Sequence, residues 1–336
     1  MKAAILTEIN KPLTVADIEP TALGIGQVLV RVLMSGLCGA QLQEIAGLKN
    51  NAKFVPHLLG HEGCGYVEDI GPGVTKVKVG NKVILHWKVS TGIESNFPQY
   101  IYNNKLIYSG KVTTLSQYSI VSENRMTVVP NNISNEFCTL LGCGLSTGLG
   151  IINYDANIKF GESVLILGCG GVGLSLILGA KLASAATVIG LDITEDKRLW
   201  VEDLGGQYIN SARDYVDISN IDCIIDTTGN LELVSKYLNK LTSRGRCIIV
   251  SQPNVKNVLT ISDSFKFFSG EGQIIRATQG GNINPAEDFP RYINMYTNLM
   301  VNFNKLITHY IKLDEINSAI DLLRSSHAGR IMITTE

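Results

Sequence analysis

The sequence predicts an α/β protein that joins a doubly wound parallel sheet to a β-rich domain. The main evidence for the sheet is a glycine turn, residues 168–173, between an apolar strand and an apolar helix. The first 145 residues carry short strand-like segments instead. The chain has 336 residues, which favours two domains over one core. We expect a β-rich domain over residues 1–145 and 286–336, and the parallel sheet over residues 146–285.

The glycine turn has the spacing of a dinucleotide-binding turn. Ser163–Leu167 is an apolar run typical of a buried parallel strand, and the residues from Leu174 to Leu182 continue as a helix. The turn between them consists of Gly168, Cys169, Gly170, Gly171, Val172 and Gly173. In such turns the first glycine permits the bend, the second lets a pyrophosphate approach, and the last allows close helix–strand packing. A plain glycine-rich loop is the alternative.

An acidic residue follows the next predicted strand. Thr187–Leu191 is apolar and β-branched, and Asp192 comes directly after it. A carboxylate at this place accepts hydrogen bonds from an adenosine ribose and repels a 2′-phosphate. The pattern therefore favours NAD over NADP.

Later segments complete the predicted organisation. Further parallel strands are expected at Cys223–Asp226, Arg246–Val250 and Gln273–Arg276. In the tail, the residues from Leu313 to Leu323 predict an amphipathic helix, and Arg330–Ile333 predicts a closing strand that rejoins the first domain.

Composition narrows the class of partner. The formal net charge is -1, and no lysine- or arginine-rich run is present, so we expect neither nucleic acid nor a membrane as partner. Met1–Leu6 leads into polar residues without a secretory pattern. The seven cysteines are scattered and odd in number, which favours reduced thiols in the cytoplasm over a disulfide framework.

Four residues form a candidate metal site. Cys38, His61, Glu62 and Cys143 offer sulfur, nitrogen and carboxylate oxygen, the ligand types that zinc takes. Their spacing alone is not diagnostic. We expect no chemical role for the other cysteines. Four of them are expected to be small buried residues of the core, and Cys169 a residue of the turn: Cys64, Cys138, Cys169, Cys223 and Cys247.

The motifs around these residues occur together in one known family. Gly36–Gly39, Gly60–Glu62, Gly142–Gly148 and the turn at 168–173 follow each other as in zinc-dependent alcohol dehydrogenases. The chain thus resembles the medium-chain dehydrogenase/reductase superfamily. This resemblance implies a GroES-like catalytic domain, a Rossmann domain and a homodimer or homotetramer, with Gln273–Arg276 as the candidate edge strand.

The resemblance also implies residue roles. Cys38, His61 and Cys143 match the catalytic zinc ligands, and Glu62 matches a carboxylate that can approach the metal. The cofactor residues implied in the same way are Thr147 and Val172 beside the nicotinamide, Asp192 and Lys197 at the ribose, and Arg330 at the pyrophosphate.

Four departures from the family pattern are visible in the sequence. Ala40 replaces a hydroxyl that relays the substrate proton, and Gln41 replaces a carboxylate that supports the metal. Gln43 stands where some relatives place a histidine. No cysteine lies between Lys88 and Gly110, so a second, structural zinc is not expected, and Ser90–Phe97 is expected to form a different loop.

The implied function is reversible hydride transfer between an alcohol and NAD at one zinc site. A polyol or sugar-derived alcohol could supply its own relay hydroxyl. Two alternatives stay open: a zinc-independent reductase of the same superfamily, and a non-catalytic NAD-binding protein.

Overall fold

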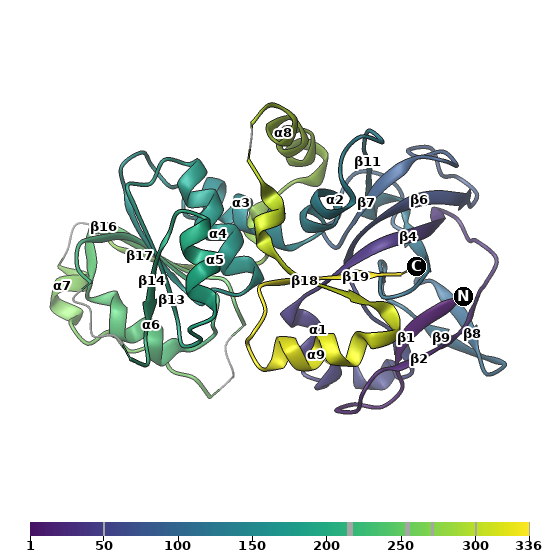
Figure 1. Cartoon of the computed structure of the whole chain (residues 1–336), viewed down its shortest axis with the longest axis horizontal. Coiled ribbons are helices and arrows are strands. Elements are labelled where there is room, and N and C mark those ends of the chain that lie inside the picture. Colours follow the sequence, from purple (N-terminus) through teal and green to yellow (C-terminus); the bar gives the residue numbers. More distant parts are fainter. Residues whose placement is uncertain (50, 214–217, 253–255, 270–271, 300, 336) are drawn as a thin grey trace. The chain divides into compact units, whose positions relative to one another are not determined.

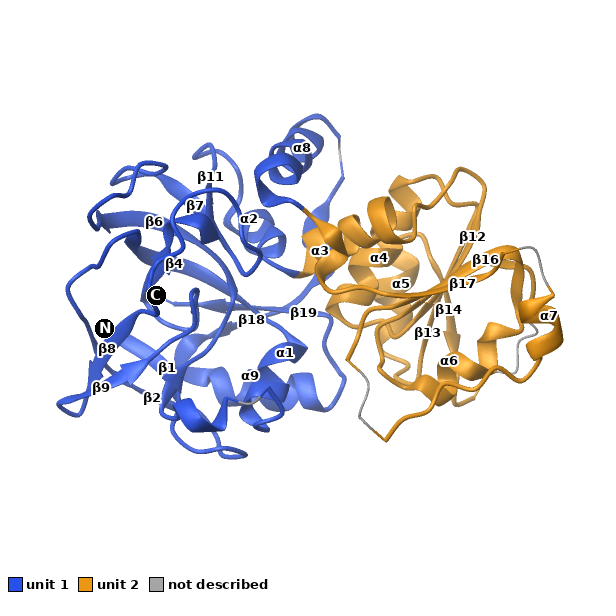
Figure 2. Cartoon of the chain, turned by 180° about the vertical axis from the view of Figure 1, so that it is seen from behind, with its two compact units in different colours: residues 1–143, 284–336 blue, residues 144–283 orange. Residues whose placement is uncertain are grey.

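The computed structural model describes residues 1–49, 51–213, 218–252, 256–269, 272–299 and 301–335. The chain divides into two compact units, residues 1–143 with 284–336 and residues 144–283 (Figures 1 and 2). The boundaries expected from the sequence were 145/146 and 285/286.

The first unit is built on two sheets. One sheet has the order β2 (Thr14–Asp17), β1 (Lys2–Leu6), β5 (His57–Leu58), β9 (Lys105–Tyr108), β8 (Gln99–Tyr102), β3 (Glu19–Pro20). The other has the order β11 (Met126–Val128), β7 (Lys82–His86), β6 (Glu62–Ile70), β4 (Gln27–Leu37), β19 (Arg330–Thr334), β18 (Ile307–Lys312), and β10 (Tyr118–Ser122) also pairs with β4. The helices of this unit are α1 (Gly39–Ile45), α2 (Asn135–Leu141), α8 (Pro285–Asn298) and α9 (Ile316–Arg324).

The predicted return of the tail is confirmed. Strand β19 pairs antiparallel with the end of β4, where Ile331 lies opposite Leu37. Helix α9 packs Ile316 and Ile320 into the same core as Ile45 of α1. The tail, which is about 290 residues further along the chain, thereby holds the end of β4 in place. Cys38 comes directly after this end.

The second unit is a six-stranded parallel sheet. Its order is β14 (Gln207–Asn210), β13 (Thr187–Asp192), β12 (Ser163–Leu167), β15 (Ile221–Asp226), β16 (Leu241–Ile249), β17 (Ile274–Ala277). Its helices are α3 (Gly144–Gly150), α4 (Gly171–Leu182), α5 (Lys197–Asp203), α6 (Leu231–Leu238) and α7 (Ser264–Phe268). The strand order reverses at β12, as a doubly wound sheet requires, and the glycine turn follows this strand. The α/β fold class is therefore confirmed.

Apolar burial explains why these strands form. In β12, Val164, Leu165, Ile166 and Leu167 have no exposed side-chain area, as expected of a strand covered on both faces. Among the described residues, no single helix has the length and hydrophobicity needed to cross a membrane. One bent pair of helices, α2 together with residues 144–155, is long and apolar enough by length and composition alone.

Candidate functional site

Three of the four predicted ligands come together in the first unit. Cys38, His61 and Cys143 offer one ligand atom each, and these atoms lie within 4.8 Å of one another. They come from three separate segments: Cys38 caps α1 after β4, His61 precedes β6, and Cys143 follows α2. The Nε2 atom of His61 lies 3.3 Å from the Cys143 sulfur. Two thiols and one imidazole in this arrangement suit zinc and leave a fourth position open.

Each thiol changes the ionisation of its neighbours. The Cys143 thiol, together with His61 and Arg330, holds the pKa of Cys38 well below its ordinary value. The same contact with Cys38, assisted by burial, raises the pKa of Cys143. Burial lowers the pKa of His61, but Cys38, Glu62 and Glu44 together outweigh this and the net shift is upward. Cys38 is thus predisposed to be the thiolate that a metal requires.

Glu62, which acts electrostatically on His61 and Cys143, is held in a buried ion pair. Its side chain is fully buried, and its Oε1 lies 2.9 Å from Nη1 of Arg330, which is also buried. Arg330 Nη1 further donates to the Leu37 carbonyl at 3.3 Å. Burial opposes the charge of Arg330, but Glu62 and the cysteines raise its pKa overall. The predicted contact of Arg330 with a pyrophosphate stays a prediction; in this structure the guanidinium pairs with Glu62.

Two motif glycines make room for Glu62. A Cβ at Gly36 would lie 2.6 Å from the Glu62 carboxylate, and a Cβ at Gly142 would lie 2.8 Å from the Glu62 backbone. Real Cβ atoms do not approach so closely. Gly36 therefore makes room for the buried carboxylate, whereas Gly142 permits close packing against the backbone of Glu62 and the Leu85 carbonyl, 2.5 Å from its Cβ position.

Gln41 supports His61 despite lacking a carboxylate. Its Oε1 accepts from the Cys38 backbone N–H at 3.0 Å, and its Nε2 lies 2.7 Å from Nδ1 of His61. Gln41 is fully buried at the third position of α1, where a glutamine can reach back to the residue that caps the helix. Glu44 Oε2 lies 3.4 Å from Gln41 Nε2. A carboxylate at position 41 would face that of Glu44, so the amide avoids a like-charge contact.

Glycine occupies each position of the turn for a different structural reason. Gly168 has φ +91°, a conformation that favours glycine. A Cβ at Gly173 would lie 1.9 Å from the Gly168 carbonyl oxygen, so α4 can pack here only with glycine. A Cβ at Gly170 would meet nothing within 4 Å. Gly171 opens α4 and Val172 is its half-buried second residue. The open space beside Gly170 suits the close approach of a ligand.

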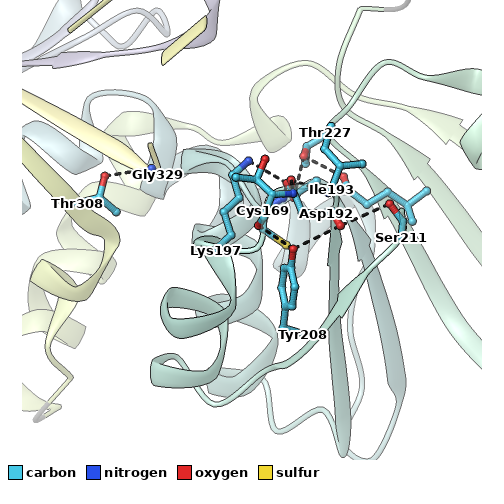
Figure 3. Close-up of polar contacts among 12 residues, drawn as sticks. Cys169, Asp192, Ile193, Lys197, Tyr208, Ser211, Thr227, Thr308 and Gly329 are labelled. Carbon is cyan, nitrogen blue, oxygen red and sulfur yellow. Dashed lines mark hydrogen bonds and ion pairs between the residues drawn. The ribbon is translucent and has the colours of Figure 1, made fainter. Parts of the chain in front are cut away.

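Asp192 joins the turn to the end of β13 (Figure 3). Its Oδ2 accepts from the Cys169 backbone N–H at 2.8 Å and pairs with Lys197 Nζ at 2.9 Å. Its Oδ1 accepts from the backbone N–H groups of Ile193 and Thr194 at 2.8 and 3.1 Å. The structure thus brings Asp192 and Lys197 together as a buried pair, and Thr147 is buried in α3.

The remaining cysteines are buried, as expected. Burial raises the pKa of Cys223 and Cys247 to about 12 and raises that of Cys169 as well. Such thiols stay protonated and behave as small apolar groups.

Comparisons with known proteins agree with these sites. Residues 24–131 match the family described as the alcohol dehydrogenase GroES-like domain, and residues 171–298 match the one described as zinc-binding dehydrogenase. "Alcohol dehydrogenase 6" of Peromyscus maniculatus is 30% identical over 367 residues, which cover 99% of this chain and 97% of that protein.

Solved structures share the fold. Benzyl alcohol dehydrogenase from Acinetobacter calcoaceticus superposes with a TM-score of 0.86 at 23% identity, covering 100% of this chain and 99% of that one. A protein described as a short chain alcohol dehydrogenase from E. coli CFT073, complexed with NADH, superposes with a TM-score of 0.81 at 19% identity, covering 99% of both chains.

Proposed function

This chain belongs to the zinc-type alcohol dehydrogenases of the medium-chain dehydrogenase/reductase superfamily, an alcohol/carbonyl oxidoreductase family, and we propose that it exchanges hydride with NAD at one zinc site. The observation that carries the proposal is the grouping of Cys38, His61 and Cys143 within 4.8 Å. Two sulfurs and a nitrogen are a zinc-suited donor set with one position left for substrate.

The chain's residues divide the work at this site. When bound, zinc supplies Lewis acidity that stabilises negative charge on the substrate oxygen. Cys38, with its depressed pKa, provides a thiolate, and Gln41 orients the His61 ring. Glu62 is paired with Arg330, so we assign it a supporting role rather than a place among the ligands. Ala40 carries no hydroxyl, so a proton leaves the substrate by a route that does not use this side chain.

The NAD site is assigned to the second unit. The open space beside Gly170 and the N-terminal turn of α4 would receive the pyrophosphate. Asp192 and Lys197 would hold the adenosine ribose, while Thr147 and Val172 would lie beside the nicotinamide. The NADH complex of the E. coli neighbour supports NAD as the cofactor class.

Two further features complete the proposal. Strand β17 is an edge of the parallel sheet with largely exposed residues, and we assign it the pairing contact of a homodimer or homotetramer. The described cysteines form no disulfide, which fits a reducing cytoplasm.

The test combines metal analysis with assays across alcohols and carbonyls. We expect one zinc per chain and NAD-dependent turnover that Cys38→Ser abolishes. Turnover without metal would instead identify a zinc-independent reductase, and NAD binding without turnover would identify a non-catalytic binding protein.

A further inference from the structure

A cavity of about 330 Å³ lies within the first unit, and His61 forms part of its wall. Ligand sites in proteins commonly have volumes of about 300–1,000 Å³, and a cavity of about 150 Å³ already holds benzene. The space therefore accommodates a substituted aromatic ring. Because His61 belongs to both the metal group and this wall, an occupant of the cavity lies against the candidate metal site.

The walls of the cavity are mainly apolar. Leu58 and Leu59 are buried, whereas Phe54, Phe97 and Tyr108 are each about half exposed, at 49%, 59% and 48%. Exposed aromatic rings around a cavity gain most from an occupant that covers them. Phe97 comes from the loop 90–97, which Glu123 holds by accepting from the Ile93 N–H at 2.9 Å.

Small residues leave the cavity open. Ser109 and Gly110 line it, and neither carries a side chain that could fill it. A Cβ at Gly110 would lie 3.3 Å from the Val112 carbonyl oxygen and otherwise meet only ordinary contacts. A larger residue at position 110 would therefore reduce the space available to a ligand.

Two wall residues, Asn51 and Thr113, each carry a buried polar atom that has no hydrogen-bond partner among the described residues. Asn51 Nδ2 lies 3.0 Å from the Glu44 carbonyl, to which it donates, and 3.0 Å from His57 Nε2. The Glu44 carbonyl fixes the orientation of this amide, so His57 Nε2 accepts and its Nδ1 donates to the Leu58 carbonyl at 2.8 Å. Among the described residues, Asn51 Oδ1 is buried without a hydrogen-bond partner. Such an acceptor gains from a donor on the ligand.

We propose that this cavity selects alcohols and aldehydes that carry an aromatic ring with a hydrogen-bond donor remote from the reacting carbon. The inference rests on the proposed function and names its substrate class. A polyol is disfavoured, because most of its hydroxyls would face the apolar wall formed by Phe54, Leu58 and Leu59, where they would find no hydrogen-bond partner.

The first experiment measures kcat/KM with NAD for ethanol, benzyl alcohol, sorbitol, and 3- and 4-hydroxybenzyl alcohol with their methyl ethers. We expect benzyl alcohol to exceed both ethanol and sorbitol at least about tenfold. At least one hydroxybenzyl alcohol should exceed its methyl ether. Preference for sorbitol overturns the proposal, and equal rates for every hydroxy and methoxy pair overturn the role of Asn51.

The second experiment narrows the cavity. Gly110→Val should lower the benzyl-to-ethanol ratio of kcat/KM at least about tenfold, with Gly110→Ala between it and wild type. Phe54→Ala should lower the same ratio, whereas Phe160→Ala, an 88% exposed phenylalanine of the second unit, should leave it unchanged. An unchanged ratio in folded Gly110→Val, judged by its melting temperature, overturns the proposal.

Failure of the proposed function is distinguishable from failure of this inference. If the protein turns over no alcohol or carbonyl, the proposed function fails, and calorimetric titration with the hydroxybenzyl alcohols still tests the cavity. Binding that Gly110→Val weakens supports the inference. Absence of binding to wild type overturns it.

Discussion

Arg330 and Glu62 form a buried ion pair, with Nη1 and Oε1 2.9 Å apart, whose charges act on the three grouped ligands. Arg330 begins the last strand and Glu62 begins β6, so the pair connects the tail to the candidate metal site. Removal of one partner from a buried pair leaves an uncompensated charge.

Loss of Arg330 should therefore destabilise the protein. Arg330→Met is expected to lower the free energy of unfolding by about 3–5 kcal/mol, measured by urea denaturation. The double variant with Glu62→Gln should recover much of this loss. Arg324→Met, which breaks an exposed pair with Asp321, is the control and should change it by under about 1 kcal/mol. If Arg330→Met and Arg324→Met lowered the free energy of unfolding by similar amounts, the importance assigned to the buried pair would be contradicted.

Gln41 should influence metal affinity without being a ligand. In this structure Gln41 Nε2 donates to His61 Nδ1, whereas a zinc-bound Nε2 leaves the ring proton on Nδ1, so zinc binding requires the amide to turn its oxygen towards Nδ1. Gln41→Leu removes this acceptor and is expected to weaken zinc binding about 10- to 100-fold, measured by competition with a chelating dye. Gln43→Leu on the same helix is the matched control. Equal zinc affinity of the Gln41 variant and wild type would show that the amide does not support the ligand.

Two glycines of the turn should separate folding from cofactor binding. Gly173→Ala introduces a Cβ 1.9 Å from the Gly168 carbonyl and should cost about 2–3 kcal/mol of stability. Gly170→Ala meets open space and should change stability by less than about 1 kcal/mol, yet weaken NADH binding about tenfold. Thermal unfolding and NADH fluorescence titration measure the two effects. Normal NADH affinity in Gly170→Ala would place the pyrophosphate elsewhere.

His86 should make stability depend on pH. Burial lowers its pKa from 6.5 to about 4, and its Nδ1 lies 2.7 Å from the Lys88 carbonyl. The unfolded chain therefore binds this proton below pH 6.5, while the folded protein does not until about pH 4. The contribution of neutral His86 to the free energy of unfolding is complete above pH 6.5 and is lost as the pH falls to 4. The loss is on the order of 3 kcal/mol. Denaturant titrations of wild type and His86→Gln between pH 4 and 6.5 test this prediction. If the free energy of unfolding of the two proteins changed in parallel with pH, the role of His86 would be contradicted.

Local patterns in the sequence predicted five of the six strands of the parallel sheet, and the edge strand β14 (Gln207–Asn210) was not predicted. Ser163–Leu167 is observed as β12 with the bounds expected from its apolar residues, because a strand buried on both faces needs a continuous apolar run. The apolar residues in 27–32 are typical of a strand, but β4 extends to Leu37 because the tail strand pairs with its end. Pairing between distant segments leaves no local signal.

The candidate site divides in the same way. The grouping of Cys38, His61 and Cys143 followed from motif order and ligand chemistry. The hydrogen bonds of Gln41 and the partner of Arg330 could not be predicted, since both depend on contacts between separate elements. The capping position of Gln41, three residues after Cys38, was the one local signal available.

The most direct test of the central claim is the zinc content of freshly purified protein that has met no chelator, measured by elemental analysis for wild type and Cys38→Ser. We predict about one zinc per wild-type chain, at a site with three protein ligands, and a loss of both metal and NAD-dependent turnover in the variant. Wild-type protein without zinc, together with undiminished turnover by Cys38→Ser, would contradict the account.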